Sequence, residues 1–238
     1  MDYTIRRSAR AHHVWLRLSS SGELVVVLPR GFSEKRVPEL LLKHRVWLER
    51  AEKRVEARRR TLQKEVPANL PEVVHLRAVG QSWAVQYRPT GSKRVAAVAR
   101  PQNVLLLSGS TAEREACRQA LLRWLRRKAV AELEPWFREL ARRGRFSVSR
   151  VVVRSQRTRW ASCSRKGAVS LNLRLLFVTP ELAEHVMLHE LCHTVRMDHS
   201  RRFWEQLGKH DPEWQLHRRQ LRAEWQRVPL WLDATPTP

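Results

Sequence analysis

The first part of the chain passes from one periodic pattern of apolar residues to another. Apolar and polar residues alternate over three short stretches, as in half-buried β-strands, and predict strands over residues 3–7, 14–18 and 24–28. A turn cluster at residues 19–22 makes the last two a predicted hairpin. After Ser33 the apolar spacing becomes helical, carried by Leu41, Leu42, Val46, Trp47, Ala51 and Val55. The opposite face of this helix is basic, which indicates a solvated face or, alternatively, a stripe that binds phosphate.

A second series of strand patterns follows the proline-rich break at residues 67–71. It predicts strands over residues 73–78, 82–87, 94–99 and 104–107. Thr111 is then the candidate cap of a long helix that runs past Val130. Pro135 should kink or interrupt this helix, because proline removes a backbone hydrogen bond. Gly144 should end it.

The last part of the chain places a strand directly before another helix. Residues 148–153 and 168–173 alternate as strands, and a polar, basic loop at 154–166 separates them. We expect the strand at 168–173 to lie at a sheet edge facing the next helix, where an extended peptide could add by main-chain hydrogen bonds. That helix begins at Thr179-Pro180, a cap followed by a first-turn proline. Two further helices are predicted, over residues 200–208 and from Asp211-Pro212 onwards.

These patterns together predict an α+β fold in two parts. Residues 1–66 form a strand-rich region with a long helix, and residues 67–233 form a second domain with a mixed or antiparallel sheet. Residues 234–238 are expected to be a disordered tail.

The composition is that of a basic protein without a disulfide scaffold. The net charge of +23 favours acidic partners, with nucleic acid first, although an exposed basic surface explains the charge equally simply. The three cysteines, Cys117, Cys163 and Cys192, are scattered, which fits reduced thiols in the cytosol. No apolar run is long enough to span a bilayer and no signal peptide is evident. We therefore expect a soluble, cytoplasmic protein.

The most informative motif is His189-Glu190-Leu191-Cys192-His193. Positions i and i+4 lie on one face of a helix, so His189 and His193 can reach one cation. Glu190 lies beside the first histidine, where a carboxylate can act as general base on a water at the metal. A catalytic zinc keeps three protein ligands and one open position. The motif therefore predicts a Zn2+ site with its own base, the alternative being a surface helix with two unrelated histidines.

The third ligand must come from outside this helical turn. His185 shares the helix face, but three ligands at i, i+4 and i+8 would spread over about 12 Å of helix axis. His199 can serve only if the helix ends and the chain turns back after His193. A longer zinc-protease motif has the same spacing with glycine at that turn, whereas this chain has Arg196. The turn must therefore be made without glycine.

Three segments also resemble a known protein family. The segments TRWASCS, VSLNLRLLF and HELCHTVRMDHSRRFW resemble the YgjP-like predicted zinc metallopeptidases, which are related to SprT-type zincins. The resemblance is densest over residues 150–205 and implies a zincin-like domain over 67–233. It also implies that His189, His193 and His199 bind Zn2+ and that Glu190 is the catalytic acid and base. One departure is Ala161, where the family usually has glycine.

Several other residues in this region are open to two interpretations. Trp160 is either a loop anchor or a wall for the substrate, and Asn172 has either a structural role or hydrogen-bonds a substrate backbone. Arg159, together with Arg157, is a candidate for holding a carboxylate or phosphate. Cys163 and Cys192 are interpreted as packing residues rather than nucleophiles or ligands.

Three functions remain to be compared. The leading hypothesis is a zinc-dependent metallohydrolase, most simply a peptidase that acts on a protein or peptide. The second is a nucleic-acid-associated module whose zincin core is structural or acts only on DNA-bound proteins. Such association would be independent of nucleotide sequence. The third is a metal-binding protein without turnover, against which Glu190 argues, because a structural site needs no base.

Overall fold

The computed structural model describes residues 3–8, 13–18, 24–45, 48 and 70–232. The chain divides into two compact units, Met1–Pro67 and Ala68–Pro238. Each unit has its own hydrophobic core. They are described separately.

The first unit is a small three-stranded sheet with one short helix. Its strand order is β1-β3-β2, with β1 parallel and β2 antiparallel to β3. Alternate residues of β3 are buried together with Val37 and Leu48, as its apolar pattern predicts. Most of the predicted helix beyond residue 45 lies outside the described residues. The elements are β1 (Tyr3–Arg7), β2 (Trp15–Leu18), β3 (Leu24–Leu28) and α1 (Val37–Lys43).

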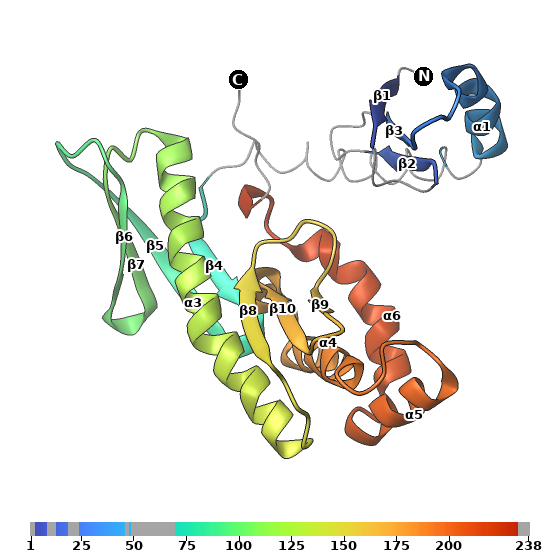
Figure 1. The fold of residues 1–238 in the computed structure, drawn as a ribbon. Helices are drawn as coiled ribbons and strands as arrows, with labels where there is room; N and C mark the ends of the chain where they lie inside the picture. The colour runs from blue at the N-terminus through green and yellow to red at the C-terminus, as the bar shows by residue number, and fades with distance from the viewer. Residues whose placement is uncertain (1–2, 9–12, 19–23, 46–47, 49–69, 233–238) are drawn as a thin grey trace. The chain divides into compact units, whose positions relative to one another are not determined.

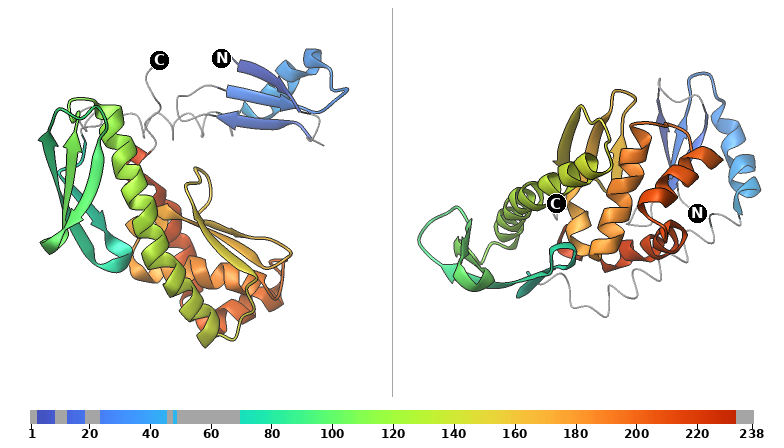
Figure 2. Two further views of the ribbon diagram at one scale, coloured as in Figure 1. Left: turned by 60° about the vertical axis from the view of Figure 1, so that its left-hand side comes forward. Right: turned by 90° about the horizontal axis from the view of Figure 1, so that it is seen from below.

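The second unit begins with a twisted four-stranded sheet. Its order is β4-β5-β7-β6, in which β5 and β7 are parallel and the other neighbouring pairs antiparallel. Figure 2 shows α3 running alongside these strands, and both contribute to the main core. The bounds are β4 (Val73–Leu76), β5 (Gln81–Pro89), β6 (Ala96–Arg100), β7 (Val104–Gly109) and α3 (Arg114–Arg143).

Helix α3 continues through Pro135 for 30 residues. The prediction of an interruption there is wrong. Leu133 and Phe137 on either side of the proline are fully buried in the same core, so tertiary packing keeps both sides of the proline within one helix. Gly144 is the residue after the helix, as predicted.

A second, three-stranded sheet carries the segment that precedes the histidine-rich helix. Its order is β8-β10-β9, with β8 parallel and β9 antiparallel to β10. The strand predicted at the edge, residues 168–173, is therefore the central strand. The edge is formed by three residues from within the predicted loop, and these contact the helix α4. The strands are β8 (Arg150–Arg154), β9 (Ala161–Cys163) and β10 (Ala168–Asn172).

Three helices complete the second unit: α4 (Pro180–His193), α5 (Arg201–His210) and α6 (Trp214–Glu224). Both α5 and α6 pack against α4 (Figure 1). The predicted α+β fold class is confirmed. Over the ranges that the structure describes, no helix is long and apolar enough to cross a membrane.

Candidate metal centre

Helix α4 brings the motif to the middle of the main core of the second unit. Thr179 precedes the helix, Pro180 occupies its first turn and Glu181 adds the acidic charge that a helix N-terminus favours. Most residues after Glu181 are buried, including His185, Glu190 and His193. The helix is thus held on several sides, and its last turn cannot shift without disturbing the core.

The imidazoles of His189, His193 and His199 converge at the end of α4. The Nε2 atom of His189 lies 3.1 Å from Nε2 of His193 and 3.2 Å from Nε2 of His199. Nitrogens bound to one tetrahedral zinc at about 2.0–2.1 Å would be roughly 3.3 Å apart. The spacing and the three-imidazole donor set therefore fit a zinc ion.

His199 reaches the centre because the chain turns back directly after α4. The Arg196 N–H donates to the carbonyl of Cys192 at 2.9 Å, which closes the end of the helix. Arg196 keeps a negative φ, so the turn is made without the left-handed residue that glycine would supply. Asp198 then accepts a hydrogen bond from the Ser200 N–H at 2.9 Å. The turn fixes the backbone on both sides of His199.

Burial keeps two of the candidate histidines in the neutral form, and a hydrogen bond leaves the Nε2 lone pair of His193 free. His193 donates its Nδ1 proton to the Arg196 carbonyl at 2.9 Å, which leaves Nε2 as the free lone pair. Burial, and then the neighbouring His193 and His199, lower the pKa of His189 to about 3. Burial also lowers the pKa of His199. Both rings are neutral at neutral pH, the state in which imidazole binds a metal.

Glu190, which follows His189 on α4, is a buried carboxyl group. Burial raises its pKa to about 7, and two effects oppose this shift: a hydrogen bond from the Cys163 N–H and the charge of Arg159. The N–H comes from the edge strand β9. Arg159 is exposed on the loop just before β9. Strand β9 and the loop before it thus each supply one group that acts on the side chain of the predicted base.

Aromatic residues of α5 form one wall of the centre. The Phe203 ring stacks on His193 at 4.6 Å between centroids. The Trp204 ring lies 5.5 Å from that of His199, and its Nε1–H donates to the His199 carbonyl at 3.0 Å. The sequence predicts a packing role for both residues. Their contact with the ligand histidines depends on the turn at 194–200 and could not be predicted.

Helix α6 adds an arginine that sequence reasoning missed. Trp214 stacks on Trp204 at 4.5 Å, and the Arg218 guanidinium lies over the Trp204 ring at 4.8 Å. The charge of Arg218 is a further, smaller cause of the low pKa of His189 and His199. The only sequence signal was the i, i+4 spacing of Trp214 and Arg218, which places both on one helix face.

A buried carboxylate beside the centre was also missed. Asp211 accepts hydrogen bonds from Nδ1 of His185 at 2.6 Å and from Nδ1 of His217 at 2.9 Å. Burial is the main cause that lowers the pKa of His185. His185 is therefore a neutral donor to Asp211, and it lies outside the convergent set, as helix geometry predicts. These three residues could also hold an ion, but their spacing is that of direct hydrogen bonds.

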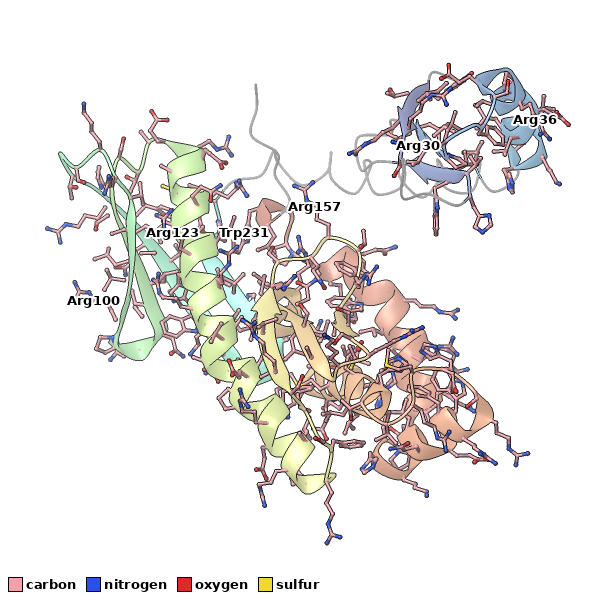
Figure 3. All side chains as sticks on the ribbon, viewed as in Figure 1. Arg30, Arg36, Arg100, Arg123, Arg157 and Trp231 are labelled. Atoms are coloured by element: carbon pink, nitrogen blue, oxygen red, sulfur yellow. The ribbon has the colours of Figure 1, made fainter. Side chains whose placement is uncertain are left out.

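The remaining candidates divide between structural and accessible positions. Asn172 is fully buried, and its amide donates to the carbonyls of Gln156 and Arg159 at 2.8 and 2.7 Å. Of the two predicted interpretations this favours the structural role, because both amide donors already have partners within the chain. Trp160 is buried and stacks on Trp225 at 4.2 Å, which favours a loop anchor over a substrate wall. Arg157 is exposed on the loop between β8 and β9 (Figure 3).

The three cysteines are free thiols. Burial raises the pKa of Cys163 to about 11 and that of Cys192 to about 12. Neither is a thiolate at neutral pH, so neither acts as a nucleophile without a further activating group. Both cysteines are consistent with the packing role that the sequence predicts.

Comparison with known families identifies the family of the chain. A model of the YgjP-like metallopeptidase domain matches residues 12–224. The chain belongs to the YgjP-like metallopeptidase family. Comparisons with curated proteins and with solved structures gave no match. Family membership supports a metallopeptidase or related hydrolase, and the histidine triad is a group that could hold the metal ion such an enzyme needs.

Proposed function

We propose that the protein is a zinc-dependent peptidase with Glu190 as its general base. The main support is the convergence of three imidazole Nε2 atoms, together with the burial of Glu190, the residue after His189 on α4. Membership of a metallopeptidase family supports peptide bonds as the substrate. A purely structural zinc site would need neither an exposed third ligand nor a neighbouring base.

His189, His193 and His199 would hold the zinc ion. When bound, zinc supplies Lewis-acid chemistry that polarises a carbonyl group and increases the acidity of water. Glu190 takes a proton from the attacking water and passes it to the leaving amine. The hydrogen bond from the Cys163 N–H holds the carboxylate in orientation during both transfers. The exposure of His199 leaves the centre open to substrate on that side.

The edge strand β9 is the proposed binding strand for the substrate. Ser162 faces Ser170 in the register, and on either side of it the Ser164 N–H donates to the Ala168 carbonyl and the Asn172 N–H donates to the Trp160 carbonyl. In an antiparallel ladder the alternate residues, Ala161 and Cys163, then direct their backbone groups outwards. The Cys163 N–H is used by Glu190, so the groups left for a substrate are the Cys163 carbonyl and the N–H and carbonyl of Ala161. No strand within the described residues pairs with that side. An extended peptide can therefore add there by main-chain hydrogen bonds.

Two arginines are the proposed contacts for substrate carbonyl or carboxylate groups. Arg159 lies near the base and Arg218 near the ligand histidines, as their effects on the pKa values of Glu190 and His189 indicate. Neither side chain forms an ion pair with a described carboxylate. Their donors therefore remain available to a substrate.

The variant Glu190→Gln tests the proposal. Glutamine keeps the shape but cannot accept the proton, so hydrolysis of an unstructured protein should fall by about a hundredfold or more. Zinc content, measured by metal analysis, should stay at the wild-type value. The matched control is Glu184→Gln on the same helix, which should keep full activity. Equal cleavage by Glu190→Gln and wild type would assign the activity to another site, and loss of zinc from that variant would mean that Glu190 supports the metal.

A further inference from the structure

A basic groove lies in the second unit, between α3 and the edge strand β6. It encloses about 800 Å³ and is lined by residues of β6, of the segment before it and of the first half of α3. Helix α3 and β6 are in direct contact. Figure 3 labels Arg123 on α3 and Arg100 at the end of β6. None of the metal ligands, nor Glu190, lines this groove.

The positive charge of the groove is not balanced. Its cationic lining residues are Lys93, Arg94, Arg123 and Arg127, and none of the described residues that line it is acidic. Within the described part of the chain, no carboxylate forms an ion pair with any of the four. The groove therefore concentrates the field of a chain whose net charge is already +23.

Two of these cations are held in place by β6 and by the residue that precedes it. Arg123 donates from Nη2 to the Val95 carbonyl at 3.0 Å, and Arg127 donates from Nη2 to the Ala97 carbonyl at 3.5 Å. The two arginines are one helical turn apart on α3. Each guanidinium has five N–H donors in a rigid plane, and these bonds use one of them. Because these hydrogen bonds already fix the two side chains, their other donors can bind an anion with little further loss of side-chain freedom.

The rest of the lining favours a phosphate backbone over a peptide. Its neutral polar members, Thr90, Ser92, Ser108 and Gln119, add hydrogen-bond donors, and its apolar members are only alanine and valine. The described lining includes no aromatic residue on which a base could stack and no large apolar residue to build a pocket for a protein side chain. Contacts of this kind position a nucleic acid without reading its sequence.

We propose that this groove binds the sugar-phosphate backbone of nucleic acid independently of nucleotide sequence. The interaction does not depend on peptidase activity, and it would bring the metal centre close to proteins that are themselves bound to nucleic acid. Binding of phosphate groups releases condensed counterions. The logarithm of the binding constant therefore falls linearly with the logarithm of the salt concentration.

The test measures binding of labelled single-stranded and duplex oligonucleotides to the full chain by fluorescence anisotropy over a range of salt concentrations. The groove variant combines Lys93→Gln, Arg94→Gln and Arg127→Gln. It retains Arg123, whose hydrogen bond to the Val95 carbonyl is the shorter of the two. The control variant combines Arg165→Gln, Arg219→Gln and Arg222→Gln, which are exposed and lie outside the groove. Both variants lose the same formal charge.

The groove variant should bind at least about tenfold more weakly, with a salt slope shallower by roughly one for each phosphate group that the variant no longer binds. The control variant should change affinity by less than about threefold, because a diffuse field alone would weaken both variants equally. Circular dichroism should show both variants folded.

Three results would overturn the inference. The first is an absence of binding by wild type at micromolar protein and low salt. The second is an equal loss of affinity in the groove and control variants. The third is displacement of a fluorescent polyglutamate from the groove with no displacement by DNA, which would assign the groove to an acidic protein.

Discussion

His193 and His199 support the same centre from different environments. His193 is buried and its Nδ1 proton is held by the Arg196 carbonyl, whereas His199 is exposed on a turn. Removal of an exposed side chain normally changes stability by less than about 0.5 kcal/mol. His199 is therefore the ligand whose loss separates metal binding from folding.

We predict that His199→Ala lowers zinc content well below one ion per chain while the fold is kept. Two imidazoles would remain, and two ligands hold zinc more weakly than three. Metal analysis after dialysis measures the zinc, and circular dichroism checks the fold. His75→Ala, an exposed histidine on β4, is the control and should keep full zinc. Full zinc in His199→Ala would require another third ligand, such as Glu205 or Glu213.

Asn172 has a structural role that a single sequence could not reveal. Its amide closes the loop before β9 through Gln156 and Arg159, and its oxygen accepts from the Arg174 N–H at 3.1 Å. These partners lie up to 16 residues away in the chain. The histidine spacing, in contrast, is set within one helical turn. Local geometry therefore predicts that His189 and His193 can reach one ion, whereas the position of His199 and the long-range hydrogen bonds of Asn172 do not follow from the helical spacing.

We predict that Asn172→Leu destabilises the protein by about 2–4 kcal/mol, because each buried polar group left unpaired costs about 1–3 kcal/mol. Urea unfolding measures the loss. Gln220→Leu, on the exposed face of α6, should change the free energy of unfolding by less than about 0.5 kcal/mol. A neutral Asn172→Leu would show that water replaces the missing hydrogen bonds.

At the scale of elements, periodicity predicted most strands and helices but not their neighbours. The apolar alternation of residues 168–173 predicts a strand, yet it carries no information about which strands lie on each side. Strand β9 has only three residues within a polar loop, too few for a pattern to appear. The order β8-β10-β9 therefore depends on pairing between distant segments. The same holds for Pro135, because its buried neighbours override its local preference.

Asp211 is the connection between the helices that surround the centre. It follows α5 and accepts bonds from His185 on α4 and His217 on α6. We predict that Asp211→Ala lowers the free energy of unfolding by about 3 kcal/mol or more, because hydrogen bonds to a charged group contribute about 1.5–3 kcal/mol each. Urea unfolding compares this variant with Glu205→Ala, which removes an exposed ion pair and should cost under about 1 kcal/mol. Equal losses would show that Asp211 is not a stabilising connection.

At the scale of the whole molecule, the three ligand histidines belong to the second unit, Ala68–Pro238. They lie on α4 and on the turn after it, and the surrounding helices pack on the main core. An ion bound there stabilises the folded state of that unit by mass action, since the unfolded chain does not hold the ligands together. Binding of a metal ion at these histidines would therefore be coupled to the folding of the unit rather than to one helix.

We predict that removal of zinc lowers the melting temperature of the wild-type protein. Free zinc at about 100 times its Kd stabilises the folded state by about 2.7 kcal/mol. For a unit of this size each kcal/mol corresponds to roughly 2–4 °C, so chelation should lower Tm by roughly 5–10 °C. Differential scanning calorimetry with and without a chelator measures the shift, and re-addition of zinc should restore it. In His199→Ala the chelator should have little effect, because that variant holds little metal. An equal shift in both proteins would mean that the chelator acts elsewhere on the chain, and no shift in wild type would mean that the histidine centre does not hold zinc in the folded protein.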